Sequence, residues 1–458
     1  MAPCLEEMPY EVMEMIAVLL DLRDLCNIRL ASRSMEVKAT QDHFKSQLRT
    51  KRVYLTEAAL GTFVQMTNRG GLGCLIQNLT LVSIAKRSEK DARSADDKIQ
   101  QDDHVNLLIR AFEYLAAESK SGMLDSLCLE VAVLPADGLA YIQPDVAEAR
   151  DRKPIWLCTA HTFSTTIRSL GASKLRLKKL NVFNSPHMQG CSLPCNELAI
   201  IDSCTNDIAP SLAQLETLSI GLSNAVTDGW RDQDCCSYES LPAAECADAE
   251  AKIMDSAGYN GFAQLLSLSD QIAELELHYF QIDFNFRLVS LDECHHALLF
   301  QHLAQQERLP RLERLLLRGL FVRQEDLVLV RKRMDPLDLH LEAIWMHSST
   351  TFVPVFAYCI SSGPRLERLC FHDLNDHDPN GNPHIVYFDG PGSIGKPSSP
   401  VSHPAARGRD HSDIHNTLVR TGHDIRQSVQ FWFAYGRTCS TQWTYQRQRE
   451  QRAEYGHH

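Results

Sequence analysis

The sequence predicts a mixed α/β protein in which a short helical segment precedes a curved array of alternating strands and helices with irregular insertions. Three observations predict this class. Apolar residues recur at helical spacing in residues 9–44, leucine-rich strand patterns recur between about residues 55 and 374, and the intervening stretches suit helices or polar loops. A chain of 458 residues exceeds the usual size of one compact core, so we expect several parts or an elongated array.

The charge and cysteine content exclude several classes of protein. The chain carries 46 Lys and Arg against 58 Asp and Glu, a net charge of -12, which argues against nucleic acid as a partner because duplex binding needs clustered cations. Its 15 cysteines are scattered along the chain, as is typical of reduced thiols in a cytoplasmic or nuclear protein. No stretch approaches the roughly 20 apolar residues of a membrane span. We therefore expect neither a nucleic acid nor a membrane as partner.

The first helix is predicted from Pro9 to Leu20. Proline suits the first turn of a helix because its missing N–H is not needed there. Val12, Ile16 and Leu19 then follow at spacings that place them on one helical face. The segment is therefore a short amphipathic helix.

Two further helices are predicted before residue 50. One begins near Asp24, whose carboxylate can accept from the free N–H groups of the first turn, and the other begins at Ser34 and extends to Phe44. Three helices of about ten residues cannot bury their apolar faces against one another alone. A partner or the rest of the chain must cover them.

This order of residues resembles the F-box family, with Met8 where the family usually has Leu. The matching positions are Leu5, Met8-Pro9, Glu11-Val12, Ile16, Leu19, Asp24-Leu25, Arg29-Leu30, Ser32-Arg33 and Phe44. In that family a three-helix hook, here residues 1–50, docks on a Skp-type adaptor that links to cullin, and the remaining chain selects a protein for ubiquitination. The resemblance implies that the adaptor-binding residues are Leu5, Pro9, Val12, Ile16, Leu19, Leu25 and Leu30. The alternative is an ordinary helical cap over the open end of the following domain.

Residues 51–374 contain an irregular internal repeat. Its strand patterns centre on Leu79, Leu127, Leu180, Leu218, Leu275, Leu315, Leu339 and Leu369, with successive spacings of 48, 53, 38, 57, 40, 24 and 30 residues. A strand and a helix repeated along a chain are typical of a leucine-rich repeat solenoid, although most of these spacings exceed the usual ~20–29 residues. We predict a degenerate solenoid. The alternative is an unrelated α/β domain whose buried strands are rich in leucine.

Composition divides the remainder of the chain. Polar, acidic or proline-containing stretches predict loops near residues 86–104, 135–154 and 222–260. Residues 375–412 are rich in Gly, Pro and Ser and predict a flexible loop with a small strand signal at "HIVYF". Residues 413–458 predict a carboxy-terminal cap and tail, in which Phe431, Trp432 and Phe433 pack on the final repeat.

No motif predicts an enzyme. The string from Gly390 to Lys396 fits the spacing of a phosphate-binding loop, but Pro397 follows where such a loop needs a Ser or Thr hydroxyl. An isolated pair, Cys191 and Cys195, lacks a second ligand pair at zinc spacing. We therefore expect no catalytic residue and no cofactor.

The other candidate metal ligands also favour a structural interpretation. Cys294, His295 and His296 are consecutive, so on a helix they point about 100° apart and cannot face one ion. The best remaining cluster is His372, Asp373, His377 and Asp378, which a polar loop after a strand explains better. We expect no metal site.

The sequence thus predicts a substrate-recognition subunit of a Skp-cullin-F-box ubiquitin ligase, whose leucine-rich body binds a protein substrate. The alternative is a leucine-rich interaction scaffold unrelated to ubiquitin, whose amino-terminal helices cap its repeats. A third class, an intracellular hydrolase, would require a cleft with convergent polar side chains.

Overall fold

The computed structural model describes residues 5–68, 72–86, 96–119, 121–134, 152–185, 191–223, 257–279, 297–347, 350–361, 365–377, 383–389, 391–394 and 416–433. Helices and strands alternate along most of these ranges. The sequence Cys294-His295-His296 and the residues Gly390, Lys396 and Asp378 lie outside them.

A 12-stranded, mostly parallel sheet organises the chain, which confirms the predicted α/β class. Its order is β1-β2-β3-β4-β6-β7-β8-β10-β12-β16-β15, with β5 (Leu193–Pro194) paired to β6. Nine strands follow one another in chain order and run parallel. They are β1 (Thr50–Tyr54), β2 (Asn78–Lys86), β3 (Met123–Leu134), β4 (Arg176–Val182), β6 (Thr217–Ser223), β7 (Glu274–Tyr279), β8 (Arg314–Arg318), β10 (Asp338–Glu342) and β12 (Arg368–His372). A doubly wound sheet would reverse this order in the middle, and this sheet does not.

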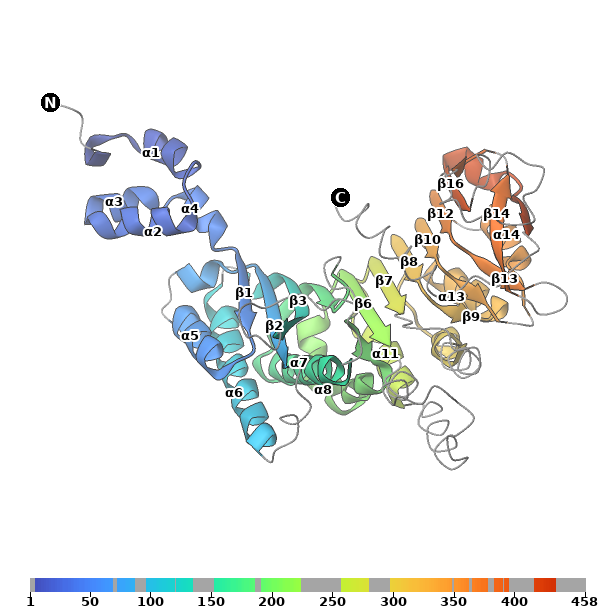
Figure 1. The fold of residues 1–458 in the computed structure, drawn as a ribbon, viewed down its shortest axis with the longest axis horizontal. Helices are drawn as coiled ribbons and strands as arrows, with labels where there is room; N and C mark the ends of the chain where they lie inside the picture. Colours follow the sequence, from blue (N-terminus) through green and yellow to red (C-terminus); the bar gives the residue numbers. More distant parts are fainter. Residues whose placement is uncertain are drawn as a thin grey trace.

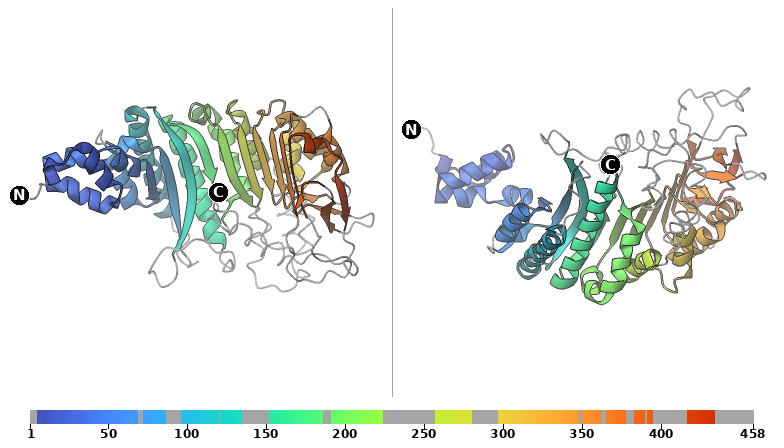
Figure 2. Two further views of the ribbon diagram at one scale, coloured as in Figure 1. Left: turned by 90° about the horizontal axis from the view of Figure 1, so that it is seen from above. Right: turned by 60° about the horizontal axis from the view of Figure 1, so that its bottom comes forward.

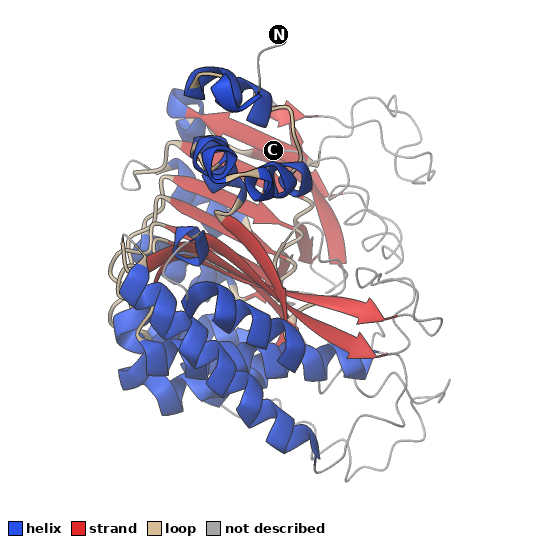
Figure 3. Ribbon diagram, turned by 90° about the vertical axis from the view of Figure 1, so that its left-hand side faces the viewer, coloured by secondary structure: helices blue, strands red, loops and turns tan. Residues whose placement is uncertain are grey.

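The described helices of the body cover one face of the sheet (Figures 2 and 3). They are α5 (Glu57–Asn68), α6 (Asp96–Glu118), α7 (Arg152–Ser173), α8 (Ile200–Leu212), α11 (Ala257–Ser267), residues 297–305, α13 (Gln324–Met334) and α14 (Val353–Ile360). Short 3-10 helices are η2 (Leu72–Leu75), η5 (Cys195–Ala199) and η9 (Gly422–Arg426). The other face of the sheet carries no described helix.

The eight leucines that mark the predicted repeats form one continuous row. Each lies directly opposite the next on the neighbouring strand, from Leu79 through Leu127, Leu180, Leu218, Leu275, Leu315 and Leu339 to Leu369. All eight are at most 1% exposed. A second buried row lies two residues further along each strand, because side chains alternate between the two faces. It comprises Val53, Leu81, Leu129, Val182, Ile220, Leu277, Leu317, Leu341, Phe371 and Leu418.

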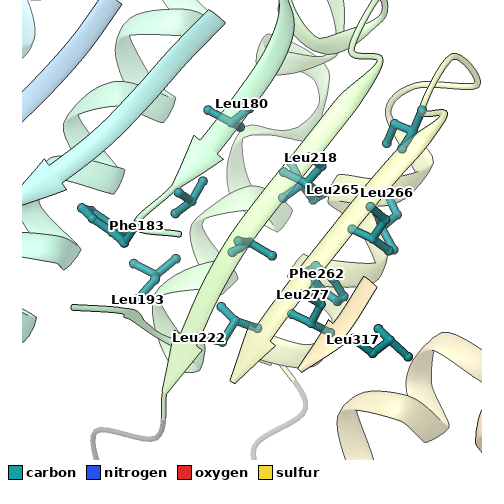
Figure 4. Packing of buried hydrophobic residues seen from close by; sticks show 14 of the residues in the cluster. Leu180, Phe183, Leu193, Leu218, Leu222, Phe262, Leu265, Leu266, Leu277 and Leu317 are labelled. Carbon is teal, nitrogen blue, oxygen red and sulfur yellow. The ribbon is translucent and has the colours of Figure 1, made fainter. Parts of the chain in front are cut away.

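These rows form the core together with the helices. Figure 4 shows Leu218 near Leu265 of α11 and Leu277 near Phe262, all members of one buried cluster. Helix α11 approaches η5 closely because Gly261 of α11 has no side chain. A Cβ at this position would lie 2.0 Å from the carbonyl oxygen of Leu198 in η5. The core thus extends without interruption from the sheet into the helical layer.

Helix length accounts for part of the uneven spacing of the repeats, although the longest spacing, of 57 residues, contains α11, which has only 11 residues. The two segments with spacings of 48 and 53 residues contain α6 and α7, which are 23 and 22 residues long. The segments with spacings of 24 and 30 residues contain α13 and α14, which are 11 and 8 residues long. The loop predicted at 86–104 is therefore wrong from Asp96 onward, because α6 begins there. The other two predicted loops lie mostly outside the described residues.

A left-handed turn recurs after the last three parallel strands. Gly319, Ala343 and Asp373 occupy the same place after β8, β10 and β12, with φ values of 71°, 50° and 49°. Each turn leads into a short strand of a second sheet with the order β17-β14-β13-β11-β9. These strands are β9 (Phe321–Val322), β11 (Trp345–Met346), β13 (Asn375–His377), β14 (Pro383–Asp389) and β17 (Gln430–Phe433).

The carboxy-terminal part is more ordered than the sequence indicated. The flexible loop predicted for 375–412 is wrong where β13, β14 and β15 (Ser393–Ile394) occur, and "HIVYF" is confirmed as part of β14. Strand β16 (Thr417–Thr421) pairs antiparallel with β12. Phe431 packs against Phe356 of α14, with ring centroids 5.1 Å apart. This segment therefore covers the last parallel strand, whereas the side chains of Trp432 and Phe433 and residues 434–458 lie outside the description.

Leu218→Ala tests the contribution of the leucine row. Removing a fully buried leucine side chain leaves a cavity, so we expect the free energy of unfolding to fall by about 2–5 kcal/mol. Urea denaturation followed by circular dichroism measures the change. Leu30→Ala is the matched control because Leu30 is 85% exposed; equal destabilisation by both substitutions would contradict the assigned core.

Candidate functional site

Four short helices form a separate module at the amino-terminal end of the chain (Figure 1). After η1 (Leu5–Glu7) they are α1 (Tyr10–Ala17), α2 (Leu22–Ala31), α3 (Arg33–Ala39) and α4 (Asp42–Gln47). The buried apolar residues of this module are Met13, Ala17, Leu25, Met35, Ala39 and Phe44, and none of them belongs to the core cluster of the body. Ala17, Leu25 and Phe44 form one cluster, against which Leu20, Cys26 and Leu48 pack. The module therefore has a small apolar interior of its own.

The helix boundaries differ from the sequence prediction in three places. The first helix is shorter than predicted, because Pro9 is its N-cap and Ala17 its last residue. Asp21 rather than Asp24 caps α2, since its carboxylate accepts from the Asp24 N–H at 2.8 Å. The predicted third helix is two helices, α3 and α4, and Phe44 belongs to α4.

Side chains from one helix satisfy the ends of another within the module. A carboxylate oxygen of Glu14 on α1 accepts from the His43 N–H in the first turn of α4 at 2.6 Å. The N-cap residue of α4 does not cap this helix with its own side chain. The ammonium group of Lys38 donates to the carbonyl oxygens of Glu6 and Met8 at 2.5 and 2.7 Å. The guanidinium group of Arg29 lies 4.3 Å from the centre of the Phe44 ring. These contacts hold the helices together where apolar packing is sparse.

Exposed apolar side chains concentrate on this module. Of the large apolar side chains described as exposed, eight lie in residues 5–37 and four elsewhere, namely Leu157, Leu329, Val353 and Ile394. The eight, which we name the amino-terminal apolar surface, are Leu5, Tyr10, Val12, Met15, Val18, Leu19, Leu30 and Val37. Scattered exposed apolar residues are ordinary, so the concentration of eight of them on one short module makes it a candidate for an interaction surface.

The structure places most of the residues predicted to bind an adaptor on this surface. Leu5, Pro9, Val12, Leu19 and Leu30 are exposed, and Ile16 is half-buried. Leu25 is the exception: it is fully buried in the core of the module, so its side chain is not available to a partner in this conformation.

Sequence reasoning missed four members of the surface, Tyr10, Met15, Val18 and Val37. Met15 and Val18 follow Val12 at successive spacings of three residues, a helical signal that was present in the sequence. The sequence predicts a helix that extends to Leu20, whereas α1 ends at Ala17 and Val18 is its C-cap. The exposure of Val18 depends on where the helix ends.

The helix-free face of the main sheet carries a continuous chain of polar contacts. The Asn184 side-chain amide donates to Ser219 Oγ at 2.9 Å, and the Ser219 hydroxyl lies 3.4 Å from a carboxylate oxygen of Glu276. Arg318 pairs with Glu276 at 3.9 Å and with Glu342 at 2.8 Å, and His340 lies 3.7 Å from Glu342. The chain thus links strands β6, β7, β8 and β10.

The ionisation states of Glu342 and His340 in this network follow from their burial and from the neighbouring charges. Burial opposes ionisation of Glu342, but Arg318, His340 and His372 outweigh it and hold the pKa of the Glu342 carboxyl below its usual value. Burial lowers the pKa of His340 to about 4, so its imidazole is neutral near pH 7. A general acid or base needs a pKa near the operating pH. Neither Glu342 nor His340 meets that requirement near pH 7.

The candidate metal ligands from the sequence have other contacts. His372 Nε2 lies 3.1 Å from the Asp373 carboxylate, and His372 Nδ1 lies 2.6 Å from Thr417 Oγ1. Cys191 and Cys195 are both buried, and burial raises the pKa of the Cys191 thiol well above its usual value. Within the described ranges, no group of three or more His, Cys, Asp or Glu side chains is placed to hold a metal ion.

Comparison with known proteins found no relative: no family model matches the sequence, and no curated protein matches it. Among the described helices, none combines the length and the apolar character needed to cross a membrane.

Arg318→Met tests the polar network. The substitution leaves Glu276 and Glu342 without their cation, and we expect the free energy of unfolding at pH 7 to fall by about 3–5 kcal/mol. Because the pKa of Glu342 is lowered in the folded state, its contribution is present above its unfolded pKa and is lost as the pH falls through the folded one. The difference in the free energy of unfolding between Arg318→Met and the wild type should therefore decrease as the pH falls.

Urea denaturation at several pH values measures this dependence. Arg314→Met is the matched control, since Arg314 lies at the start of the same strand and is exposed. A stability loss for Arg318→Met that does not depend on pH would contradict the assigned pairing with Glu342.

Proposed function

We propose that this chain is the substrate-recognition subunit of a Skp-cullin-F-box type ubiquitin ligase. The observation that carries the proposal is the amino-terminal apolar surface, which consists of eight exposed apolar side chains on one short helical module. In this proposal the module docks on a Skp-type adaptor, which links it to cullin, as the resemblance of residues 5–44 to the F-box family implies.

Stable docking requires a partner to bury several side chains of this surface at the same time. Burying one large apolar side chain contributes about 1.5–3 kcal/mol. Four such side chains contribute on the order of 6–12 kcal/mol, which is comparable with the ~4–15 kcal/mol cost of association. A partner must therefore cover most of the set, and each member is individually important.

The body is proposed to be a degenerate leucine-rich repeat array whose helix-free sheet face binds the protein substrate. Support comes from the chain order of the parallel strands, the single helical layer and the in-register leucine row. Catalysis then resides in other subunits, and this chain raises the local concentration of substrate near them.

The second candidate function is an interaction scaffold unrelated to ubiquitin, in which the amino-terminal helices cap the repeats. A cap would share the core of the repeats and cover their open end. The module instead has a core of its own, and Figure 1 shows it projecting beyond β1. This arrangement favours the docking proposal.

Leu19→Asp tests docking on the adaptor. Leu19 is 85% exposed, so the substitution should leave the stability of the protein unchanged. It places a charge where an apolar contact is proposed, and we expect the affinity for the purified Skp-type adaptor to fall at least tenfold in a quantitative pull-down.

Leu329→Asp on α13 is the control, because it changes an exposed leucine of the body in the same way. The docking assignment is wrong if Leu19→Asp binds the adaptor as well as the wild type does. Equal loss in both variants would indicate a nonspecific effect.

Removal of residues 1–48 separates the two candidate functions. The cut spares β1, which begins at Thr50. Because the body has a separate core, we expect a soluble truncated chain with the thermal transition of the body and without adaptor binding. Thermal denaturation and the same pull-down measure both properties. Loss of the folded body would instead support the cap.

A further inference from the structure

A lysine on α3 holds the segment that leads into α1. The ammonium group of Lys38 donates to the carbonyl oxygens of Glu6 and Met8 at 2.5 and 2.7 Å, although these residues lie 32 and 30 positions earlier in the chain. It also lies 5.6 Å from the centre of the Tyr10 ring, a separation at which a cation is attracted to the face of an aromatic ring. One side chain thus contacts three alternate residues of the stretch 5–10.

The carbonyl groups of Glu6 and Met8 precede the hydrogen-bond ladder of α1. That ladder begins with the bond from the Met13 N–H to the Pro9 carbonyl oxygen, so α1 provides no donor for the two earlier carbonyls. Hydrogen bonds from a charged donor are stronger than those between neutral groups. Within the described part of the chain, no other hydrogen bond joins residues 5–8 to α2, α3 or α4. Lys38 therefore fixes the path of this segment.

The same segment carries part of the amino-terminal apolar surface. Leu5 and Tyr10 are members of that surface, and Pro9 between them is exposed as well. None of the three belongs to a core cluster, so their positions follow from the path of the backbone. A segment that has to be ordered during binding lowers the affinity, whereas a segment that is ordered beforehand does not.

We propose that Lys38 is a positioning residue for docking, whose ammonium group holds residues 5–10 so that Leu5, Pro9 and Tyr10 form one surface with α1. Lys38 acts through these residues rather than through a contact of its own with the partner. This inference rests on the proposed function, in which the amino-terminal apolar surface binds the Skp-type adaptor. Lys38 is not among the positions that carry the family resemblance, because only the folded module brings it beside residues 6–10.

Two substitutions of Lys38 in the full chain test the positioning role. Lys38→Met removes the donors and keeps an unbranched side chain, whereas Lys38→Arg keeps a cation that can donate. We expect Lys38→Met to lower the affinity for the purified adaptor about tenfold in isothermal titration calorimetry, and Lys38→Arg to retain it within about threefold. Lys45→Met is the matched control, since Lys45 on α4 makes no side-chain hydrogen bond or ion pair with a described residue, and it should bind as the wild type does.

Amide hydrogen exchange in the free chain reports the order of the segment directly. The Met8 N–H donates to the Leu5 carbonyl oxygen at 3.3 Å within the stretch that Lys38 holds. We expect Lys38→Met to accelerate exchange at Met8 and to leave it unchanged at Leu25, whose N–H lies in the interior of α2. Accelerated exchange at Leu25 would show a general loss of the module fold and would overturn the positioning role.

A double-mutant cycle separates positioning from direct contact with the adaptor. If Lys38 acts by placing Leu5, the combined effect of Lys38→Met and Leu5→Ala on the affinity is smaller than the product of the two separate effects. Additive losses, unchanged exchange at Met8, or wild-type affinity in Lys38→Met would each overturn the positioning role while the docking proposal stands. Failure of the wild type to bind the adaptor would overturn the docking proposal itself, and this inference with it.

Discussion

The structure depends on the register of its parallel strands. Two rows of apolar side chains cross the sheet, and every member of a row lies opposite its neighbours on the adjacent strands. Because neighbouring strands are about 4.8 Å apart whatever the length of the connection, this register lets α6 and α14 differ almost threefold in length within one continuous core. A slip of one residue in any strand would exchange its buried leucines for the polar side chains of the other face. The register therefore sets both the core and the composition of the helix-free surface.

Much of this arrangement was predictable from the sequence, since it depends on local alternation. The leucines from Leu79 to Leu369 are recognisable as strand centres from the sequence alone, and their spacing indicates a repeat. Features that depend on long-range contacts were not predictable. Ser219 and Glu276 are separated by 57 residues, and only the pairing of β6 with β7 brings them together. The amino-terminal turns of α6 were mistaken for a loop because Asp96, Asp97 and their polar neighbours show no apolar face.

The amino-terminal module shows why a motif does not specify the burial of its members. Leu25 and Leu19 both matched the same family pattern, yet one is 0% exposed and the other 85%. Leu25 packs with Ala17 and Phe44 in the interior of the module, so it contributes to the fold of the module. Leu19 lies beyond the end of α1 and contributes nothing comparable to folding. An exposed leucine at this position adds little to folding, whereas the proposed apolar partner would bury it.

The two proposed binding surfaces differ in chemistry, and the difference suits different tasks. Apolar contacts provide affinity without strict geometry, which is appropriate for docking on one constant adaptor. The helix-free sheet face instead consists of groups that already have partners, such as Arg318 between Glu276 and Glu342. A protein that binds there must preserve these pairs or replace them, because an uncompensated buried charge costs about 3–5 kcal/mol. A partner that left one of these charges unpaired would bind weakly, so the network would discriminate against such partners. Selectivity of this kind suits the proposed role in substrate recognition, because apolar contacts alone place weaker demands on geometry.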